Sequence, residues 1–443
     1  MLTTLEKDTA ARPEDRFLAA FEVHAGHTLN GSNPHLQRLR QEAIAHFKRL
    51  GFPARKAEAW KYTPITDVLR RDYAVRLAPE AALNPDELAP FLIPDLDAYR
   101  VVLLNGRFVP ALSALDGLPE GVAVTSLAGA AESHAEVFNR HFGRYADPAG
   151  DAFTALNTAF VHDGLFIHVP ARTVVEKPVH VISLVRTDEP LFLQPRQLVV
   201  VEEGARLHLI ESRHALSGTR TFTSGVTELY TGPNAHVDTY LIQDEGPNAS
   251  QVDTRHLYQA TGSYASTNTI TLSGDVVRNN HGYLPDGENC ETHLLGLFLG
   301  KGKLHVDNHT LVDHARPRCF SNELFKGILD DQATGVFNGK VYVRPDAQQI
   351  NAYQSNKSVL LSETAQMYSK PELEIYADDV KCSHGATTGQ LDREALFYLR
   401  TRGLTAEQAR KVLLLAFARD VIDEIRIEPL RTHLDEVIAL RLD

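Results

Sequence analysis

Three short segments decide the fold: EEGARLHL at residues 202–209, GPNAHVDT at 232–239 and TGSYASTN at 261–268. Each joins turn-forming residues to a strand-like stretch, and Ala205, Ala235 and Ala265 lie 30 residues apart. Weak self-similarity at a fixed step is typical of a solenoid, in which each turn buries the face of the next. The pattern therefore predicts a parallel β-helix. A β-sandwich or barrel with evenly spaced strands is the alternative.

The same texture extends outward from these segments, over residues 166–388. Polar and apolar residues alternate with a period of two, and Gly, Asn, Asp or Pro separate the short runs. Amphipathic helices of 10–15 residues are not interleaved with these runs, which argues against a doubly wound α/β sheet. Predicted strands include 180–185, 197–201, 205–210, 236–242, 267–272, 293–299, 303–312 and 334–343.

The flanking regions are predicted to be mainly helical. Residues 36–50 have helical periodicity after Asn33-Pro34, whereas 99–110 predict a strand–turn–strand around Asn105-Gly106. A further helical stretch is expected at 130–142. Near the C-terminus, Asp392 is a helix cap, Thr405 and Gln408 form a capping box, and a last helix is expected over 429–440. We therefore divide the chain into 1–160, a helical N-terminal region with a small strand element, 161–390, the β-helix core, and 391–443, a helical C-terminal region.

Composition excludes several classes of protein. The 443 residues include 45 Lys and Arg against 57 Asp and Glu, and the net charge of −12 argues against a dedicated nucleic-acid binder. The three cysteines are too few and too scattered for a disulfide framework. Residues 1–16 contain no apolar signal segment, and no apolar run approaches the ~18 residues of a membrane span. These features predict a cytoplasmic protein without a membrane partner.

Cys382 and His384 are the first candidate metal ligands. They stand two residues apart in a strand-like segment, so their side chains share one face. Thiolate and imidazole both bind iron, zinc or copper(I), but two ligands do not complete a tetrahedral site. Further ligands would have to come from elsewhere in the chain or from a second chain. The structural alternative is a small buried thiol beside a hydrogen-bonded histidine.

A second candidate lies at residues 305–319. His305, Asp307 and His309 alternate and so share a strand face, and Asp313, His314 and Cys319 follow. Oxygen and imidazole ligands suit iron(II) or zinc, but a polar, solvated face of a solenoid turn fits the pattern equally well. The segment 300–303 (GKGK) lacks the frame of a phosphate loop and is interpreted as a turn. No catalytic residues are predicted.

Several segments together resemble the SufB/SufD family of iron–sulfur cluster assembly scaffolds. Few of them are diagnostic alone, but their order and spread over most of the chain make the resemblance strong. They are 56–63 (KAEAWKYT), 155–170 (ALNTAFVHDGLFIHVP), 312–314 (VDH), 321–323 (SNE), 326–329 (KGIL), 352–358 (AYQSNKS) with Leu360-Leu361, 370–375 (KPELEI), 380–387 (VKCSHGAT) and 400–404 (RTRGL).

The resemblance implies a right-handed parallel β-helix between helical N- and C-terminal regions. It implies that the C-terminal helices dock an ABC-type ATPase, SufC. Without the resemblance, the amphipathic pattern of these helices favours a helical cap on the end of the solenoid. The resemblance also implies that the β-helix pairs with a SufB-like paralogue, and that His384 contributes to a nascent iron–sulfur cluster shared across that boundary. A flavin reported in the assembled complex is matched to no residue.

Two positions separate SufB-type from SufD-type members. SufB-type chains carry a cysteine where Asn356 stands here, and a glutamate where Gly385 stands. Both departures imply a SufD-type, non-catalytic scaffold subunit. The rival is a β-helix polysaccharide lyase or hydrolase using carboxylates such as Asp307 and Asp313, although no aromatic ladder for sugars is evident. Whether the isolated chain is a homodimer, and whether Cys382 is a ligand or packing, stays open.

Overall fold

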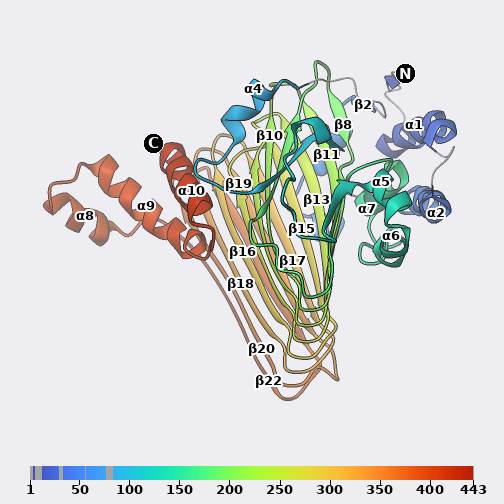
Figure 1. Cartoon of the computed structure of the whole chain (residues 1–443). Helices are drawn as coiled ribbons and strands as arrows, with labels where there is room; N and C mark the ends of the chain where they lie inside the picture. Colours follow the sequence, from blue (N-terminus) through green and yellow to red (C-terminus); the bar gives the residue numbers. More distant parts are fainter. Residues whose placement is uncertain (1–2, 5–11, 29–32, 55, 76–82, 443) are drawn as a thin grey trace.

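The computed structural model describes residues 3–4, 12–28, 33–54, 56–75 and 83–442. Most of the opening segment 1–16, for which no signal sequence is predicted, lies outside these residues. From β10 onward the chain alternates between two sheets, so that one strand from each sheet makes one turn of a solenoid (Figure 1). All pairings between these strands are parallel. The predicted parallel β-helix is confirmed, and the sandwich alternative is wrong.

The two sheets divide the solenoid strands evenly along the chain. One sheet holds β10 (Arg206–Ala215), β12 (His236–Asp244), β14 (Tyr264–Thr271), β16 (Glu291–Gly300), β18 (Phe320–Leu329), β20 (Ile350–Leu360) and β22 (Val380–Gly389). We call it the ten-stranded sheet. The twelve-stranded sheet holds β11 (Thr221–Thr231), β13 (Ala249–Gln259), β15 (Val276–Pro285), β17 (His305–His314), β19 (Thr334–Val343) and β21 (Gln366–Ile375).

The register explains the step found in the sequence. Arg206 pairs with His236 and His236 with Tyr264, and the same line of neighbours continues through Glu291 and Phe320. The step therefore stays close to the expected 30 residues, with slightly shorter and longer turns. Equivalent residues of successive turns stack at ~4.8 Å, which forms columns of side chains along the solenoid.

Shorter strands from the N-terminal part extend both sheets. The predicted strand–turn–strand is confirmed as β3 and β4, with Asn105 and Gly106 at positive φ in the turn, and β3 pairs in parallel with β7. The short strands are β1 (Thr3–Thr4), β2 (Ala74–Val75), β3 (Tyr99–Leu104), β4 (Arg107–Phe108), β5 (Ala123–Ser126), β6 (Leu165–Val169), β7 (Val179–Val185), β8 (Leu191–Leu193) and β9 (Arg196–Val201).

Helices cover the outer faces of the two sheets on opposite sides (Figure 1). Most N-terminal helices pack on the twelve-stranded sheet, where Phe153 of α7 meets Phe222 of β11. The exception is α4, whose Leu88 packs against β3 and β7 of the ten-stranded sheet. Asn33 caps α2 as predicted, by accepting a hydrogen bond from His35 N. These helices are α1 (Pro13–Thr28), α2 (Pro34–Leu50), α3 (Ile65–Leu69), α4 (Pro85–Leu88), α5 (Leu127–Ser133), α6 (Ala135–His141) and α7 (Ala152–Phe160), with 3₁₀ turns at Glu58–Trp60, Ala89–Phe91 and Pro110–Leu112.

The C-terminal helices are α8 (Arg393–Thr401), α9 (Ala406–Ile422) and α10 (Glu428–Arg441). The predicted Asp392 cap and the Thr405–Gln408 capping box are both present. Helices α9 and α10 pack on the outer face of the ten-stranded sheet through an apolar cluster that includes Leu297 and Leu414. They do not cover the last turn, where nearly every residue of β22 is exposed. The interpretation of these helices as an end cap is therefore wrong.

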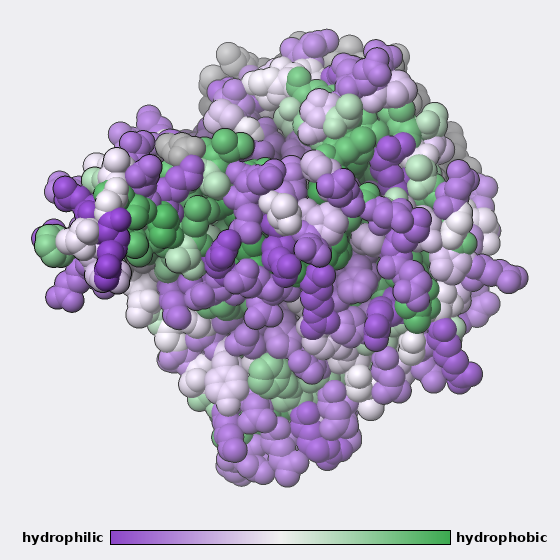
Figure 2. Space-filling view, turned by 60° about the vertical axis from the view of Figure 1, so that its left-hand side comes forward, coloured by the Kyte–Doolittle hydropathy of each residue, from purple (hydrophilic) through white to green (hydrophobic). Residues whose placement is uncertain are grey.

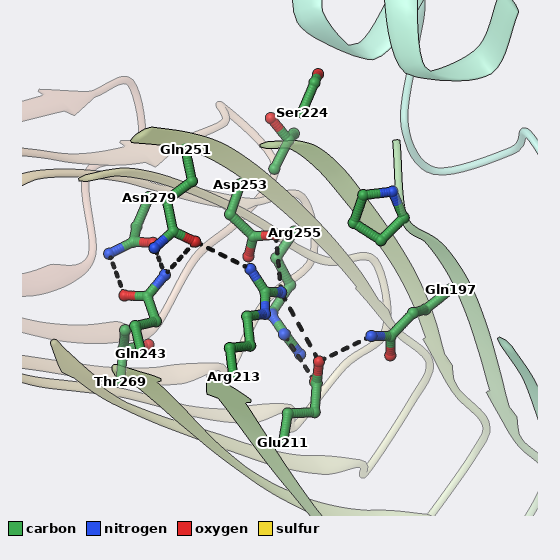
Figure 3. A network of polar contacts seen from close by, with 12 residues as sticks. Gln197, Glu211, Arg213, Ser224, Gln243, Gln251, Asp253, Arg255, Thr269 and Asn279 are labelled. Carbon is green, nitrogen blue, oxygen red and sulfur yellow. Dashed lines mark hydrogen bonds and ion pairs between the residues drawn. The ribbon is translucent and has the colours of Figure 1, made fainter. Parts of the chain in front are cut away.

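The interior of the solenoid is apolar at one end of the strands and polar further along them. Columns such as Leu207, Val237 and Ala265 are fully buried, and burying one such Leu or Val side chain stabilises the fold by ~1.5–3 kcal/mol. A buried polar cluster follows, with Glu211 and Arg255 at its centre (Figure 3). Alternation of polar and apolar residues gave no sign of this cluster, which the structure reveals.

The charges of the polar cluster are paired across the two sheets. Arg255 Nη2 donates to Glu211 Oε1 at 2.7 Å, and Arg213 Nη2 donates to Asp253 Oδ1 at 2.9 Å (Figure 3). Gln197 Nε2 donates to the second oxygen of Glu211 at 3.0 Å. Arg213 lowers the pKa of the Asp253 carboxyl against the opposing effect of burial. Two cations thus balance two carboxylates, which makes burial of all four tolerable.

Acid is expected to destabilise the fold below about pH 6.5 through its buried histidines. Burial lowers the pKa of His180 and His281 to about 3 and that of His314 to about 4. The unfolded chain binds protons at these sites near the ordinary pKa of ~6.5, so each site loses up to ~1.4 kcal/mol of stability per pH unit as the pH falls. Urea midpoints at neutral pH and at mildly acidic pH measure this loss.

His281→Gln provides the variant for that experiment, because His281 lies inside the solenoid with its Nε2 3.5 Å from Thr269 Oγ1. The variant is expected to show a shallower dependence of stability on pH than the unsubstituted chain. His293→Gln, at a partly exposed ring, is the control. Equal slopes in all three proteins would contradict the assignment to buried histidines.

Candidate functional site

The last turn of the solenoid is open. Strands β21 and β22 are the final strands of their sheets, and no strand in the described part of the chain pairs with their outer edges. Figure 1 shows β22 along one margin of the molecule, away from the N-terminal helices. An unpaired strand edge carries a row of free backbone N–H and C=O groups, so it is a template for pairing with another chain.

Cys382 and His384 lie on the inward-facing side of this open turn. Cys382 pairs with Ala352 and His384 with Gln354, and both partners are buried inside the solenoid. The two residues therefore continue the interior columns by one step, with no further turn to cover them. The predicted shared face is present, and His384 is exposed because it lies at the mouth of the solenoid.

The surroundings of the two residues differ. Cys382 is half-buried against an apolar cluster that also contains Cys290 and Cys319, and burial raises the pKa of its thiol. The thiol is thus protonated at neutral pH unless a metal or a partner charge displaces the proton. His384 lies outside that cluster and is free to contact a partner.

The two positions that separate SufB-type from SufD-type chains also lie in this turn and the one before it. Asn356 is fully buried, and its Nδ2 donates to the carbonyl oxygen of Phe325 at 3.2 Å, so it packs inside the solenoid. Gly385 is exposed, and a Cβ added there would contact nothing. Space in the fold therefore does not require glycine at 385.

The histidine-rich run at residues 305–309 has a different role from either predicted one. Asp307 is fully buried and accepts hydrogen bonds from Arg278 Nη1 at 2.7 Å and from Thr63 Oγ1. His305 Nε2 lies 3.1 Å from the same Thr63 oxygen, and the Arg278 guanidinium stacks on Trp60 at 3.8 Å. The run therefore clamps residues 60–63 onto β17.

This clamp corrects two expectations. The face is not solvated, and in the described part of the chain no group of three or more His, Cys, Asp or Glu side chains is arranged to hold a metal ion. Asp307 is neutralised by Arg278, and this lowers the pKa of its carboxyl. Alternation identified the shared face, but only the Trp60–Thr63 motif could have signalled its partner, because the two segments are far apart in sequence.

The carboxylates that a sugar-cleaving enzyme would use do not meet in a groove. Asp307 belongs to the clamp, whereas Asp313 pairs with Arg344 through two contacts of 2.8 Å. An aromatic series is nevertheless present on the outer face of the ten-stranded sheet, contrary to the expectation from sequence. It runs through His236, Tyr264, His293, Phe320 and Tyr353; the first two rings are stacked, and each later ring is tilted against the one before it.

The C-terminal helices present a separate apolar surface. Helix α8 buries none of its residues, and Phe397 and Tyr398 are 69% and 56% exposed. Figure 2, turned to bring this side forward, shows apolar side chains on the lobe that projects at the left. Exposed aromatic residues on a projecting helix are typical of a protein-binding surface.

Two family models match the chain. The model described as "SUF system FeS cluster assembly, SufBD core domain" covers residues 184–417, which is more than half of the chain, and the "SufBD protein N-terminal region" covers residues 11–181. The chain belongs to the SufBD family. The resemblance drawn from the sequence is confirmed.

Relatives in the SufBD family match over nearly the full length. A SufBD family protein of Synechocystis is 33% identical over 411 residues, covering 91% of this chain and 90% of the relative. The iron–sulfur cluster assembly protein SufD of Escherichia coli is 30% identical over 406 residues, covering 91% and 92%. SufD of Bacillus subtilis is 27% identical over 332 residues, covering 73% and 74%.

This SufBD protein has no helix, among the residues described, that is both long and apolar enough to cross a membrane.

Proposed function

We propose that this chain is a SufD-type scaffold subunit of an iron–sulfur cluster assembly complex. The observation that carries the proposal is the place of His384 in an interior column at the open end of the solenoid. A SufB-like paralogue that continues the solenoid would cover this mouth and bring its own ligands over the imidazole. The shared site then receives iron and sulfur as its cargo.

The strand edge supports this mode of association. Added strands bind through main-chain hydrogen bonds, and the side chains at the mouth supply specificity. His384 provides a neutral nitrogen ligand for iron, and Cys382 adds a thiol on the same face once its proton is displaced. Because two ligands are too few for a cluster, the chain acts only with a partner. In isolation, the same open turn is available to a second copy of the chain.

We also propose that α8 and the adjoining part of α9 dock a SufC-like ABC-type ATPase. Motion of that ATPase would reach the sheet through α9, because Lys326 of β18 is buried and its Nζ donates to the Phe417 carbonyl oxygen at 2.7 Å. A rigid-body shift of α9 would therefore displace the ten-stranded sheet that ends in β22. We assign no residue to the flavin that the resemblance implies, and no step passes through it.

The test mixes the chain with a cysteine-bearing SufB-like paralogue and an ABC-type ATPase. We expect a three-part complex that assembles clusters from iron(II) and a sulfur source. The matched variant Phe397→Ser/Tyr398→Ser is expected to keep the paralogue but to lose at least ~10-fold in ATPase affinity, since exposed aromatic anchors carry ~1–2 kcal/mol or more each.

Val174→Ser is the control for that variant, because Val174 is 42% exposed and lies outside the C-terminal helices. Size-exclusion chromatography and titration calorimetry measure the binding. Unchanged ATPase affinity in the double variant would remove α8 from the docking surface. Failure of the unsubstituted chain to bind the paralogue would contradict the scaffold role.

A further inference from the structure

One interior column leads directly to His384. The ladder pairs Leu294 with Glu323, Glu323 with Gln354, and Gln354 with His384. Glu323 and Gln354 are buried, whereas His384 is exposed at the mouth. Two polar side chains thus lie in line behind the proposed iron ligand, each one strand spacing of ~4.8 Å from the next.

The amide of Gln354 is held from behind. Gln354 Nε2 donates to Glu323 Oε1 at 3.2 Å, and the other carboxyl oxygen of Glu323 accepts a hydrogen bond from Thr310. Burial raises the pKa of the Glu323 carboxyl to about 7. Above that pH the carboxylate is ionised and only accepts hydrogen bonds, so it orients the amide with its NH₂ group inward. The carbonyl oxygen of Gln354 is then the free end of the side chain.

The opposite sheet leaves space for this arrangement. Gly339 of β19 faces Gln354, and a Cβ at that position would lie 2.4 Å from Gln354 Nε2. Its backbone does not adopt a positive φ, so conformational freedom is not the reason for glycine here. The missing side chain instead makes room for the Gln354 amide between the sheets.

Gln354 Oε1 is buried and has no hydrogen-bond partner. An unsatisfied buried acceptor destabilises a fold by ~1–3 kcal/mol, so a donor within reach is strongly favoured. His384 is the next residue in the same column, and its exposed ring can change rotamer rapidly. An imidazole N–H is the donor that this position offers.

We propose that Gln354, oriented by Glu323, is a positioning residue for His384. Its carbonyl oxygen accepts a hydrogen bond from one ring nitrogen, which fixes the neutral tautomer and presents the other nitrogen outward across the mouth. A ligand histidine whose second nitrogen is held in this way keeps its orientation and its basicity toward metal. The hydrogen bond between Gln354 and His384 matters for cluster assembly only if His384 has its proposed role, but its formation does not depend on that role.

The test reads the tautomer of His384 by nitrogen-15 NMR on the free chain, without partner or iron. Spectra are recorded about two pH units above the ordinary histidine pKa of ~6.5. The His384 signals are identified among the 20 histidines as those lost in His384→Asn. We expect one neutral tautomer to predominate in the unsubstituted chain. A mixture typical of a solvated imidazole would overturn the proposal.

Gln354→Leu is expected to lose the tautomer preference, and Glu323→Gln to weaken it, because the amide is then free to turn over. Asn356→Leu is the matched control, since Asn356 is buried on the same face of β20 but pairs with Ala386. It is expected to leave the tautomer unchanged. Gln354→Asn, one methylene shorter, replaces Gln354→Leu if that variant does not fold.

Retention of the single tautomer in the folded Gln354 variants would contradict the proposal. This readout is independent of cluster assembly. A fixed tautomer together with full assembly activity in His384→Ala would support the column while removing the proposed role of His384. A mixture of tautomers together with lost activity in His384→Ala would contradict the column while supporting that role.

Discussion

Replacing His384 with Ala is expected to abolish cluster assembly by the reconstituted complex while the complex itself still forms. The imidazole lies at the mouth of the solenoid, exposed and outside the packed interior, so its removal leaves no cavity. Loss of even an outer-shell partner of a metal site lowers metal affinity or activity by ~10–100-fold, and loss of a ligand is expected to exceed that range. Cluster formation followed by absorbance and by iron content measures the effect.

His293→Ala is the control for this experiment. His293 lies on the outer face of the same sheet, between Tyr264 and Phe320, and is not part of the mouth. Cys382→Ser, assayed alongside, separates a ligand from a packing residue, since serine retains the volume but not the soft sulfur. Full activity in His384→Ala would contradict the proposed site.

Replacing Arg255 with Met is expected to destabilise the protein by ~3–5 kcal/mol, the cost of breaking a buried ion pair. Arg255 is fully buried and donates a hydrogen bond to Glu211. Because Glu211 is buried too, water cannot replace the lost partner. The variant would leave two carboxylates and one guanidinium in the interior. Since a domain is stable by only ~5–15 kcal/mol, much of the stability would be lost. Urea unfolding measures the change.

The double variant Arg255→Met/Glu211→Gln tests the cause. It restores the charge balance around Arg213 and Asp253, so we expect it to recover a large part of the lost stability. Arg172→Met, at an exposed side chain, is the control and is expected to change the stability little. If the double variant were less stable than Arg255→Met, uncompensated charge would not be the cause.

Local sequence patterns predicted the fold well. The 30-residue step identified the solenoid, because stacked turns must repeat the same turn chemistry and the same alternation. Helix caps were equally accessible, since Asp392 and Thr405 act on backbone groups two or three residues away. The shared face of Cys382 and His384 also followed from the strand period of two.

Contacts between distant segments were not accessible in this way. Asp307 looked like a solvated residue or a ligand because its partners, Thr63 and Arg278, belong to other parts of the chain. The interior pair Glu211 and Arg255 was hidden because many solenoid strands are buried on both faces, so polarity no longer indicates which face meets water. Gln354 belongs to the segment 352–358 that resembles the family, but its significance depends on His384, the residue that stacks next to it in the column.

The unpaired edges of β21 and β22 affect how much of this chain a cell can synthesise without aggregation. An exposed edge strand that has no partner can pair with any compatible strand, including the same strand of a second copy of the chain. Synthesis in excess of the proposed partner subunit is therefore expected to yield self-associated or precipitated protein, whereas synthesis in equal amounts is expected to keep the chain in solution. Measuring the yield of the chain with and without the proposed partner subunit, at matched synthesis rates, would show whether the yield depends on that subunit.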